Sequence, residues 1–306
     1  MTPYNRPHLS YAAQSELLHE RGLTVNDPAA AVIALERIGY YRLQPYWAAL
    51  QMSDQQFHND AHFSHAYDLY VFDKKLRLLM LDANERIEVA VRVKIAHALG
   101  KRDQWAHRKV GCLDTMRCRK GKHDDWLTHT DASTAESQEA WVAEHIRQHG
   151  EPLPIWKAIE TWSFGEVSKL YGLLHVNDRS SISKSLGLKP DTLGSWLRCL
   201  VLVRNICAHH SRLWNKPLVN QPQVPDSWEA RTVQHIGEHT LYQTRLYASA
   251  AISAYFLTII NPKSSWKTRL MEHIQSFPVI PYLTLSHSGF HENWHDRDLW
   301  TANSAP

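Results

Sequence analysis

Apolar residues recur at steps of three or four along much of the chain, which is the spacing typical of amphipathic helices. The longest such pattern predicts a helix from about Tyr67 to Leu99, with Gly100 as a natural stop. Charged residues take its other positions, and we expect most of them on a solvated face with local ion pairs. These residues are Lys74, Lys75, Arg77, Glu85, Arg86, Glu88 and Arg92.

Further helical patterns flank this long helix. We predict two helices within residues 10–50, and Asn26 or Asp27 before Pro28 signals the start of the second. Others are expected over residues 155–174, 190–210 and 240–260. Because no segment alternates apolar and polar residues as a strand would, the chain predicts an all-α fold, a helical bundle with helical extensions at both ends.

The pattern also suggests a division of the chain. We predict an N-terminal helical extension over residues 1–60, a helical core over 61–262 and a C-terminal tail over 263–306 that packs on the core. Residues 101–150 break the helical periodicity, and the part from 101 to 122 holds eight Lys or Arg. We interpret 101–150 as an insertion with a basic surface; the alternative is an ordinary solvated loop.

Composition adds limits. The formal net charge of +3 gives no global argument for nucleic acid, so a basic surface must come from local clustering. Four irregularly spaced Cys indicate reduced thiols and not a disulfide framework. The N-terminus lacks the apolar region of a secretion signal, and the longest apolar run, residues 246–260, is too short to span a bilayer. We therefore expect a cytoplasmic protein without a membrane segment.

The segment RNICAHH, residues 204–210, is the strongest candidate for chemistry. On a helical wheel, Asn205 and His209 share one face, whereas Arg204 lies about 140° from His209. Both Arg204 and His209 reach one phosphate only if the helix bends, if Arg204 stretches around it, or if a second subunit supplies one of them. His210 falls on the continuation of the apolar stripe, which is formed by Trp196, Leu200, Val203 and Cys207.

These residue types suit RNA cleavage. The 2′-hydroxyl of RNA is itself a nucleophile, a His can transfer its proton near neutral pH, and an Arg can hold the phosphate and stabilise its developing charge. The expected products are a 2′,3′-cyclic phosphate and a 5′-hydroxyl. On spacing alone, a structural Arg and a satisfied His remain the simpler interpretation.

The run SWLRCLVLVRNICAHHSRLWN resembles the signature of the Abi family of bacterial phage abortive-infection proteins, of the AbiD and AbiF type. These belong to the HEPN superfamily, whose hallmark is an Arg followed by a His after four to six positions. Arg204 and His209 enclose four positions and His210 would enclose five. The resemblance extends to RIGYYRLQPYW at 37–47, to 69–92, to 154–171 and to the C-terminal end, and leaves out 101–150.

The resemblance implies a HEPN-type helical fold and an endoribonuclease that acts as a toxin in antiphage defence without a cofactor or metal. Arg204 would bind the scissile phosphate, His209 would be the general acid or base and Asn205 would position them, with His210 as a core or supporting residue. It also implies a homodimer through the HEPN core and a restraining partner, either a protein antitoxin or a structured small RNA. A non-catalytic module that binds such an RNA is the alternative.

Weaker candidates surround this motif. The aromatic and cationic cluster Tyr40, Tyr41, Arg42 and Trp47 could stack bases and hold phosphate, or could simply pack the N-terminal helices. Basic residues of the insertion are further RNA-binding candidates, namely Arg117, Arg119, Lys120 and Lys122. Glu85 or Glu88 could orient a catalytic His, although ordinary ion pairs are the simpler interpretation. A zinc site has weak support, because its candidates lack close Cys pairs; they are Cys112, Cys118, His107 and His123.

Overall fold

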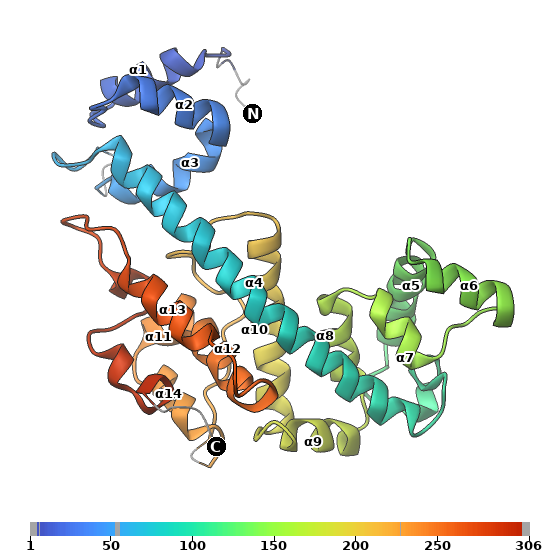
Figure 1. Ribbon diagram of the computed structural model, residues 1–306. Coiled ribbons are helices and arrows are strands. Elements are labelled where there is room, and N and C mark those ends of the chain that lie inside the picture. Colours follow the sequence, from blue (N-terminus) through green and yellow to red (C-terminus); the bar gives the residue numbers. More distant parts are fainter. Residues whose placement is uncertain (1–4, 6, 53–55, 227, 302–306) are drawn as a thin grey trace.

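A long helix, α4 (Phe63–Gly100), forms the axis of the computed structural model, which describes residues 5, 7–52, 56–226 and 228–301 (Figure 1). Its 38 residues span roughly 57 Å at 1.5 Å per residue. The predicted apolar positions are buried, including Leu69, Leu76 and Ile87. The long helix expected from the sequence is therefore confirmed, with one more turn at its start.

Three N-terminal helices pack at the beginning of α4: α1 (Tyr11–Glu20), α2 (Pro28–Ile38) and α3 (Tyr40–Trp47) (Figure 1). The predicted start of α2 is confirmed, since the Asp27 carboxylate accepts a hydrogen bond from the Ala30 amide at 2.9 Å. The sequence predicted two helices here, and the structure has three. Gly39, at φ 92°, separates α2 from α3 in a conformation that favours glycine.

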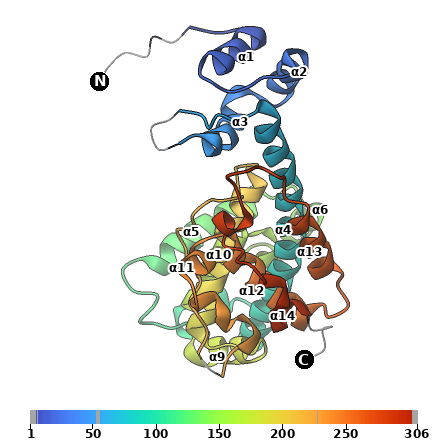
Figure 2. The same cartoon turned by 90° about the vertical axis from the view of Figure 1, so that its left-hand side faces the viewer.

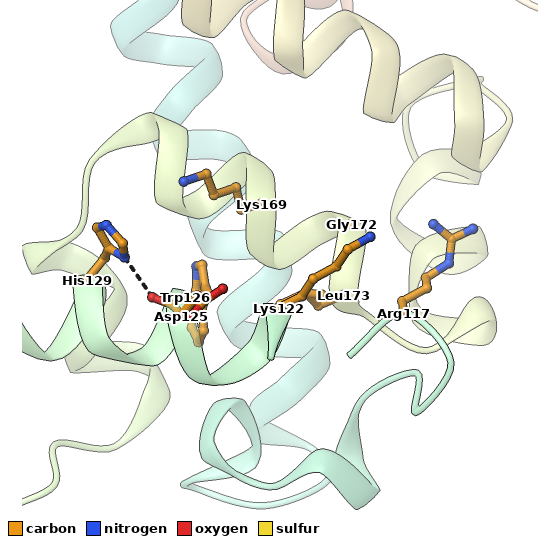
Figure 3. A pocket seen from close by; sticks show the side chains of 8 residues that line it. All are labelled: Arg117, Lys122, Asp125, Trp126, His129, Lys169, Gly172 and Leu173. Carbon is orange, nitrogen blue, oxygen red and sulfur yellow. Dashed lines mark hydrogen bonds between the residues drawn. The ribbon is translucent and has the colours of Figure 1, made fainter. Parts of the chain in front are cut away.

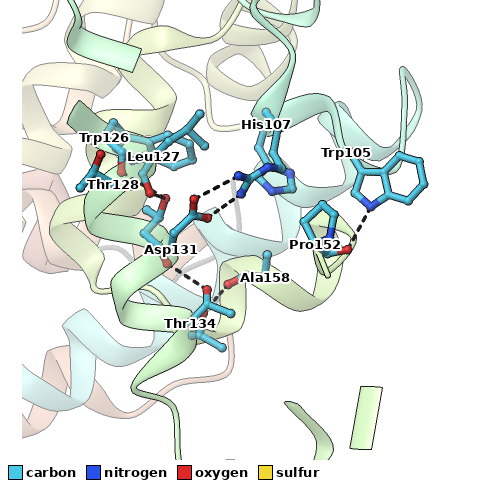
Figure 4. A network of polar contacts seen from close by, with 12 residues as sticks. Trp105, His107, Trp126, Leu127, Thr128, Asp131, Thr134, Pro152 and Ala158 are labelled. Carbon is cyan, nitrogen blue, oxygen red and sulfur yellow. Dashed lines mark hydrogen bonds and ion pairs between the residues drawn. The ribbon is translucent and has the colours of Figure 1, made fainter. Parts of the chain in front are cut away.

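The opposite end of α4 carries a second group of helices: α5 (Lys122–Ala135), α6 (Ala140–His149), α7 (Ile155–Ala158), α8 (Phe164–Leu173) and α9 (Val176–Lys184) (Figure 1). Within residues 101–150 the two helices α5 and α6 cover 122–149, whereas 101–121 consists of turns and short 3-10 helices. The interpretation of 101–150 as an insertion with a basic surface stays a prediction. Side chains of α5 tie it to the neighbouring segments, through the ion pair of Asp131 with Arg108 and the contacts of Thr134 (Figure 4).

The helix predicted over residues 155–174 is interrupted. Ser163 begins α8 with a capping box, in which its hydroxyl accepts from the Glu166 amide while the Glu166 carboxylate accepts from the Ser163 amide. The last carbonyls before this break are open to a further donor, although that of Ile159 also accepts from the Trp162 amide at 3.4 Å. The guanidinium of Arg92 donates to two of them, those of Ile159 and Trp162.

The rest of the bundle consists of α10 (Pro190–Ala208), α11 (Thr240–Thr244), α12 (Leu246–Ile260), α13 (Trp266–Gln275) and α14 (Asp298–Thr301). Helices α10, α12 and α13 pack along α4 (Figure 2). The helix predicted over 240–260 is divided at Arg245, whose backbone is extended. The described residues form isolated bridges but no strand, so the predicted all-α class is confirmed.

Two of the charged residues assigned to a solvated face of α4 are buried. Arg77 is only 5% exposed and pairs with Asp73, and Arg92 is buried beside Glu88. The predicted local ion pairs are present, since both are pairs four residues apart. The predicted solvent exposure of Arg77 and Arg92 was wrong, because the partners of these guanidinium groups, including carbonyls distant in sequence, lie inside the fold. No helix in the described part of the chain has the length and apolarity to cross a membrane.

Candidate functional site

The end of α10 forms the RNICAHH segment. The predicted apolar stripe is confirmed, since Trp196, Leu200, Val203 and Cys207 are all buried. The helix ends at Ala208, before the two histidines, and the prediction that it continues through His210 is wrong.

A Schellman motif ends the helix. The amide of His210 donates to the Cys207 carbonyl at 3.0 Å, and the amide of Ser211 donates to the Ile206 carbonyl at 2.9 Å. His210 occupies the left-handed position of this motif, at φ 56°, where glycine is usual. A side chain there costs about 1–2 kcal/mol. This turn redirects the chain, so that both histidines are exposed and His210 does not continue the apolar stripe.

Both histidines line a groove of about 510 Å³ between the end of α10 and helix α3. Arg42 of α3 donates to the His210 carbonyl at 3.0 Å, and Arg212 donates in the opposite direction to the Pro45 carbonyl at 3.1 Å. These two bonds join segments about 170 residues apart in sequence. The lining residues are Tyr41, Arg42, Pro45, Tyr46, His209, His210, Ser211, Arg212 and Lys216.

The groove is electropositive. Arg42, Arg212 and Lys216 contribute three cations, and no carboxylate is among its described lining residues. Burial lowers the pKa of Arg212, but a guanidinium keeps its charge at neutral pH. Tyr41 is 66% exposed at the edge of the groove. The groove therefore combines phosphate-binding cations, two titratable imidazoles and an aromatic ring.

A buried carboxylate supports the groove from below. Asp73 of α4 accepts hydrogen bonds from the Tyr46 hydroxyl at 2.6 Å, from the Trp214 amide at 2.6 Å and from the Leu213 amide at 3.1 Å, and it pairs with Arg77. Burial and the adjacent Asp73 charge raise the pKa of Tyr46 far above its usual value. Because these donors come from α3, from α4 and from the loop after α10, Asp73 fixes the two walls of the groove relative to each other.

Arg204 does not line this groove. It lies beside α4, where its Nε is 4.0 Å from the Glu88 carboxylate and its Nη1 donates to the Asn205 side chain at 3.4 Å. Glu88 also pairs with Arg92, so its contacts are ion pairs, as the simpler interpretation predicted; Glu85 is exposed on the same helix. The structure thus groups His209 with His210 and Arg42, and Arg204 with Asn205 and Glu88.

Comparison with known families places this site in a context. Residues 33–215 match the sequence profile of the Abi-like protein family, and this stretch is more than half of the chain. The chain belongs to the Abi-like protein family. This membership confirms the resemblance to Abi proteins and indicates a role in abortive infection, an antiphage defence. No curated protein and no solved structure matches the chain.

The matched region of this Abi-like protein contains α3, α4 and α10, and hence every residue of the groove except Lys216.

In the N-terminal cluster, Trp47 is 3% exposed and packs against Tyr40, with ring centroids 4.7 Å apart. This burial supports the packing alternative, and base stacking by Trp47 stays a prediction. Tyr40 is half-buried and accepts a hydrogen bond from Arg21 at 3.1 Å.

The basic candidates of the Abi-like protein's 101–150 segment lie elsewhere. Arg117 and Lys122 line a separate pocket beside α5 and α8, whereas Arg119 and Lys120 are exposed outside it. His123 is buried and donates to the His107 carbonyl at 2.8 Å. In the described part of the chain, no group of three or more His, Cys, Asp or Glu is arranged to hold a metal.

Sequence reasoning missed three residues of the site, Asp73, Arg212 and Lys216. Arg212 and Lys216 follow the motif directly, and a cation count over the next few residues would have drawn attention to them. Asp73 offered no such signal, because it stands among the other charges of the long helix and only the fold brings it below the groove.

Proposed function

We propose that this Abi-like protein is an endoribonuclease whose reaction centre is the groove of His209 and His210. One observation carries the proposal: two exposed imidazoles lie in a groove whose described lining has three cations and no carboxylate, and they sit on a turn whose left-handed residue is not glycine. A conformation that glycine would adopt at lower cost is a mark of sites kept for function.

In the proposed reaction, Arg42, Arg212 and Lys216 bind the phosphates of an RNA strand that lies along the groove. His209 accepts the proton of the 2′-hydroxyl as that oxygen attacks phosphorus, and His210 donates a proton to the departing 5′-oxygen. The P–O5′ bond breaks as the O2′–P bond forms, which leaves a 2′,3′-cyclic phosphate and a 5′-hydroxyl. The cations stabilise the charge that gathers on the phosphate.

Arg204 has a separate part in this proposal. Its contact with Glu88 is long and partly exposed, and such a contact is worth less than about 1 kcal/mol. The guanidinium can therefore exchange Glu88 for a phosphate at little cost. Arg204 would then hold the scissile phosphate or a neighbouring one, with Asn205 as its positioning partner.

A second copy of the chain would supply a complementary Arg204. A stripe of exposed apolar residues, Leu78, Val89 and Val93, follows one face of α4, and Val89 is next to Glu88. Exposed apolar stripes of this kind suit association with another chain. We propose that a homodimer forms on this face, which would bring the two Arg204–Glu88 pairs together. Light scattering on the wild type and on Val89→Glu tests whether the dimer forms through this face. A restraining protein or small RNA would keep such a nuclease inactive in the uninfected cell.

The rival function is RNA binding without cleavage. It is favoured by the separation of Arg204 and Asn205 from the groove of His209. Under this hypothesis both clusters grip a structured RNA, and neither performs proton transfer.

The deciding experiment incubates the full chain with total cellular RNA in EDTA, beside His209→Ala, Arg204→Ala and the control His19→Ala. His19 is exposed on α1, outside the groove. We expect cyclic-phosphate fragments from the wild type and from His19→Ala, and none from His209→Ala. Equal cleavage by His209→Ala would contradict the assignment, and intact RNA that co-purifies with every variant would establish the rival.

A further inference from the structure

A second pocket, of about 400 Å³, lies between α5 and α8, away from the groove (Figure 3). Its floor is apolar and rigid. Trp126 is buried, its indole nitrogen donates to the Glu166 carbonyl at 3.0 Å, and its ring meets Trp162 edge-on. Leu173 is also buried, and its carbonyl accepts from the Asp114 amide at 3.0 Å. The floor is therefore held in place from both sides before any ligand arrives.

Gly172 keeps this pocket open. It is the penultimate residue of α8, in the last turn of the helix. A Cβ at this position would meet nothing within 4 Å, so the absence of a side chain is not required by packing. The space that a side chain would fill belongs to the pocket, which Gly172 lines. Gly172 therefore leaves open space beside the pocket, between Lys169 and Leu173 of the same helix, which also line it.

The rim of the pocket is cationic. Lys122 comes from the first turn of α5 and Lys169 from α8, and in the described part of the chain neither has an acidic partner. Arg117 has a 3.6 Å contact with Asp114 and remains exposed. The start of α5 adds the positive end of a helix dipole. The three cationic side chains outnumber the one carboxylate of the pocket's described lining, Asp125, so the rim carries a net positive charge that favours a phosphate.

Two further side chains can recognise what is attached to that phosphate. The Nδ1 of His129 donates to the Asp125 carbonyl at 2.6 Å, which fixes the ring and leaves its Nε2 for another partner (Figure 3). The Asp125 carboxylate lines the same pocket. A carboxylate accepts hydrogen bonds from ribose hydroxyls or from an exocyclic amine, and an imidazole can accept or donate one.

We propose that this pocket binds a nucleotide, with its base on the floor of Trp126 and Leu173, its phosphate among Lys122, Lys169 and Arg117, and its sugar or base edge at Asp125 and His129. The volume lies within the range of small-molecule sites, and the mixture of an apolar floor with a few polar groups is typical of them.

The same chemistry has two sources, a free mononucleotide or one residue of an RNA strand. The RNA source rests on the proposed function. It is geometrically reasonable because α8 packs on α10, where a Cβ at Gly165 would lie 3.8 Å from Val201. Asn205 is one helical turn beyond Val201 along α10. Gly172 is two turns beyond Gly165 along α8, in the opposite direction. At 1.5 Å per residue, the path along the two helices is roughly 15–20 Å.

The test is equilibrium binding of the full chain to the four 5′-mononucleotides and to a fluorescein-labelled 12-nucleotide single-stranded RNA. The pocket variants are Lys122→Gln with Lys169→Gln, which removes two cations, and Gly172→Gln, which fills the cavity without a change of charge. Gly172→Ala controls for helix stability, and Lys184→Gln with Lys263→Gln is the charge-matched control at exposed positions outside the pocket. Circular dichroism and thermal melting establish that each variant is folded.

We expect at least about tenfold weaker binding for both pocket variants and less than twofold change for both controls, and for RNA a salt slope smaller by about 1.4 in the double lysine variant. Binding of a mononucleotide identifies a free ligand, and binding of RNA alone identifies a residue of the strand. Pocket variants that bind both probes like the wild type overturn the proposal, as do controls that weaken binding equally, or a wild type that binds neither. The two proposals fail separately. If His209→Ala loses cleavage but the pocket still binds its ligand, or if the pocket variants lose binding while cleavage continues, each result concerns one proposal alone.

Discussion

Replacement of Asp73 by Asn perturbs the support of the groove without a change in side-chain size. Asp73 is fully buried and receives the Tyr46 hydroxyl, two backbone amides and the Arg77 guanidinium. The Asn amide brings a donor where four donors already converge, and it leaves the Arg77 charge inside the protein without a counter-charge.

The magnitude follows from these contacts. Breaking one side of a buried ion pair costs about 3–5 kcal/mol, and a buried donor left without an acceptor adds about 1–3 kcal/mol. Because these contributions overlap in one network, we expect a loss of about 4 kcal/mol in the free energy of unfolding. For a chain of this size the loss lowers the melting temperature by roughly 10 °C.

The assay is urea unfolding together with RNA cleavage at a temperature where the variant remains folded. Asp82→Asn is the matched control: Asp82 is on the same helix, but it is partly exposed and pairs with the half-buried Arg86 and the exposed Arg269. Such pairs contribute less than about 1 kcal/mol. The reasoning is refuted if Asp73→Asn loses no more stability than Asp82→Asn, and the link to the groove fails if the folded variant cleaves RNA at the wild-type rate.

Three further predictions address other parts of the molecule. His210→Gly should raise the free energy of unfolding by about 1 kcal/mol, because glycine relieves the left-handed backbone, while it reduces cleavage; a destabilised variant would contradict the strain argument. Arg42→Ala should weaken RNA binding and reduce the salt slope by about 0.7, whereas Arg37→Ala, which lies outside the groove, should not. Burial, followed by the neighbouring Arg108, lowers the pKa of His107 to about 4, below that of the unfolded chain. Stability should therefore fall as the pH drops from 6.5 toward 4, by up to about 3 kcal/mol, and urea titrations of His107→Gln across this range should show a shallower fall.

The sequence was a good guide where local pattern decides structure. The apolar spacing of α4 and the Asp27-Pro28 start of α2 were predicted because periodicity and caps act within a few residues. The break before α8 was missed, although Ser163 and Glu166 are a capping box that the sequence displays. The end of α10 was missed for another reason: the left-handed residue is His210, and no glycine marks the stop.

The candidate site, too, could be anticipated only where a local sequence pattern marks it. The structure places both histidines of RNICAHH in an electropositive groove, and their part in chemistry stays a prediction. The contact of Arg42 with His210, however, joins positions 168 apart, and no local pattern encodes such a pair. The burial of Arg77 was equally hidden, because its environment depends on Tyr46 and Asp73 being brought together by the fold.

The groove lies at the interface between two segments of the chain. Two hydrogen bonds join these segments, one from Arg42 to the His210 carbonyl and one from Arg212 to the Pro45 carbonyl. A fragment that begins at residue 61 would keep the whole RNICAHH segment and lose one wall of the groove. The N-terminal helices, added back as a separate polypeptide, would have to re-form both arginine bonds to restore that wall. Fragment complementation therefore suits this protein. Two fragments that are each inactive alone would restore the groove when they assemble.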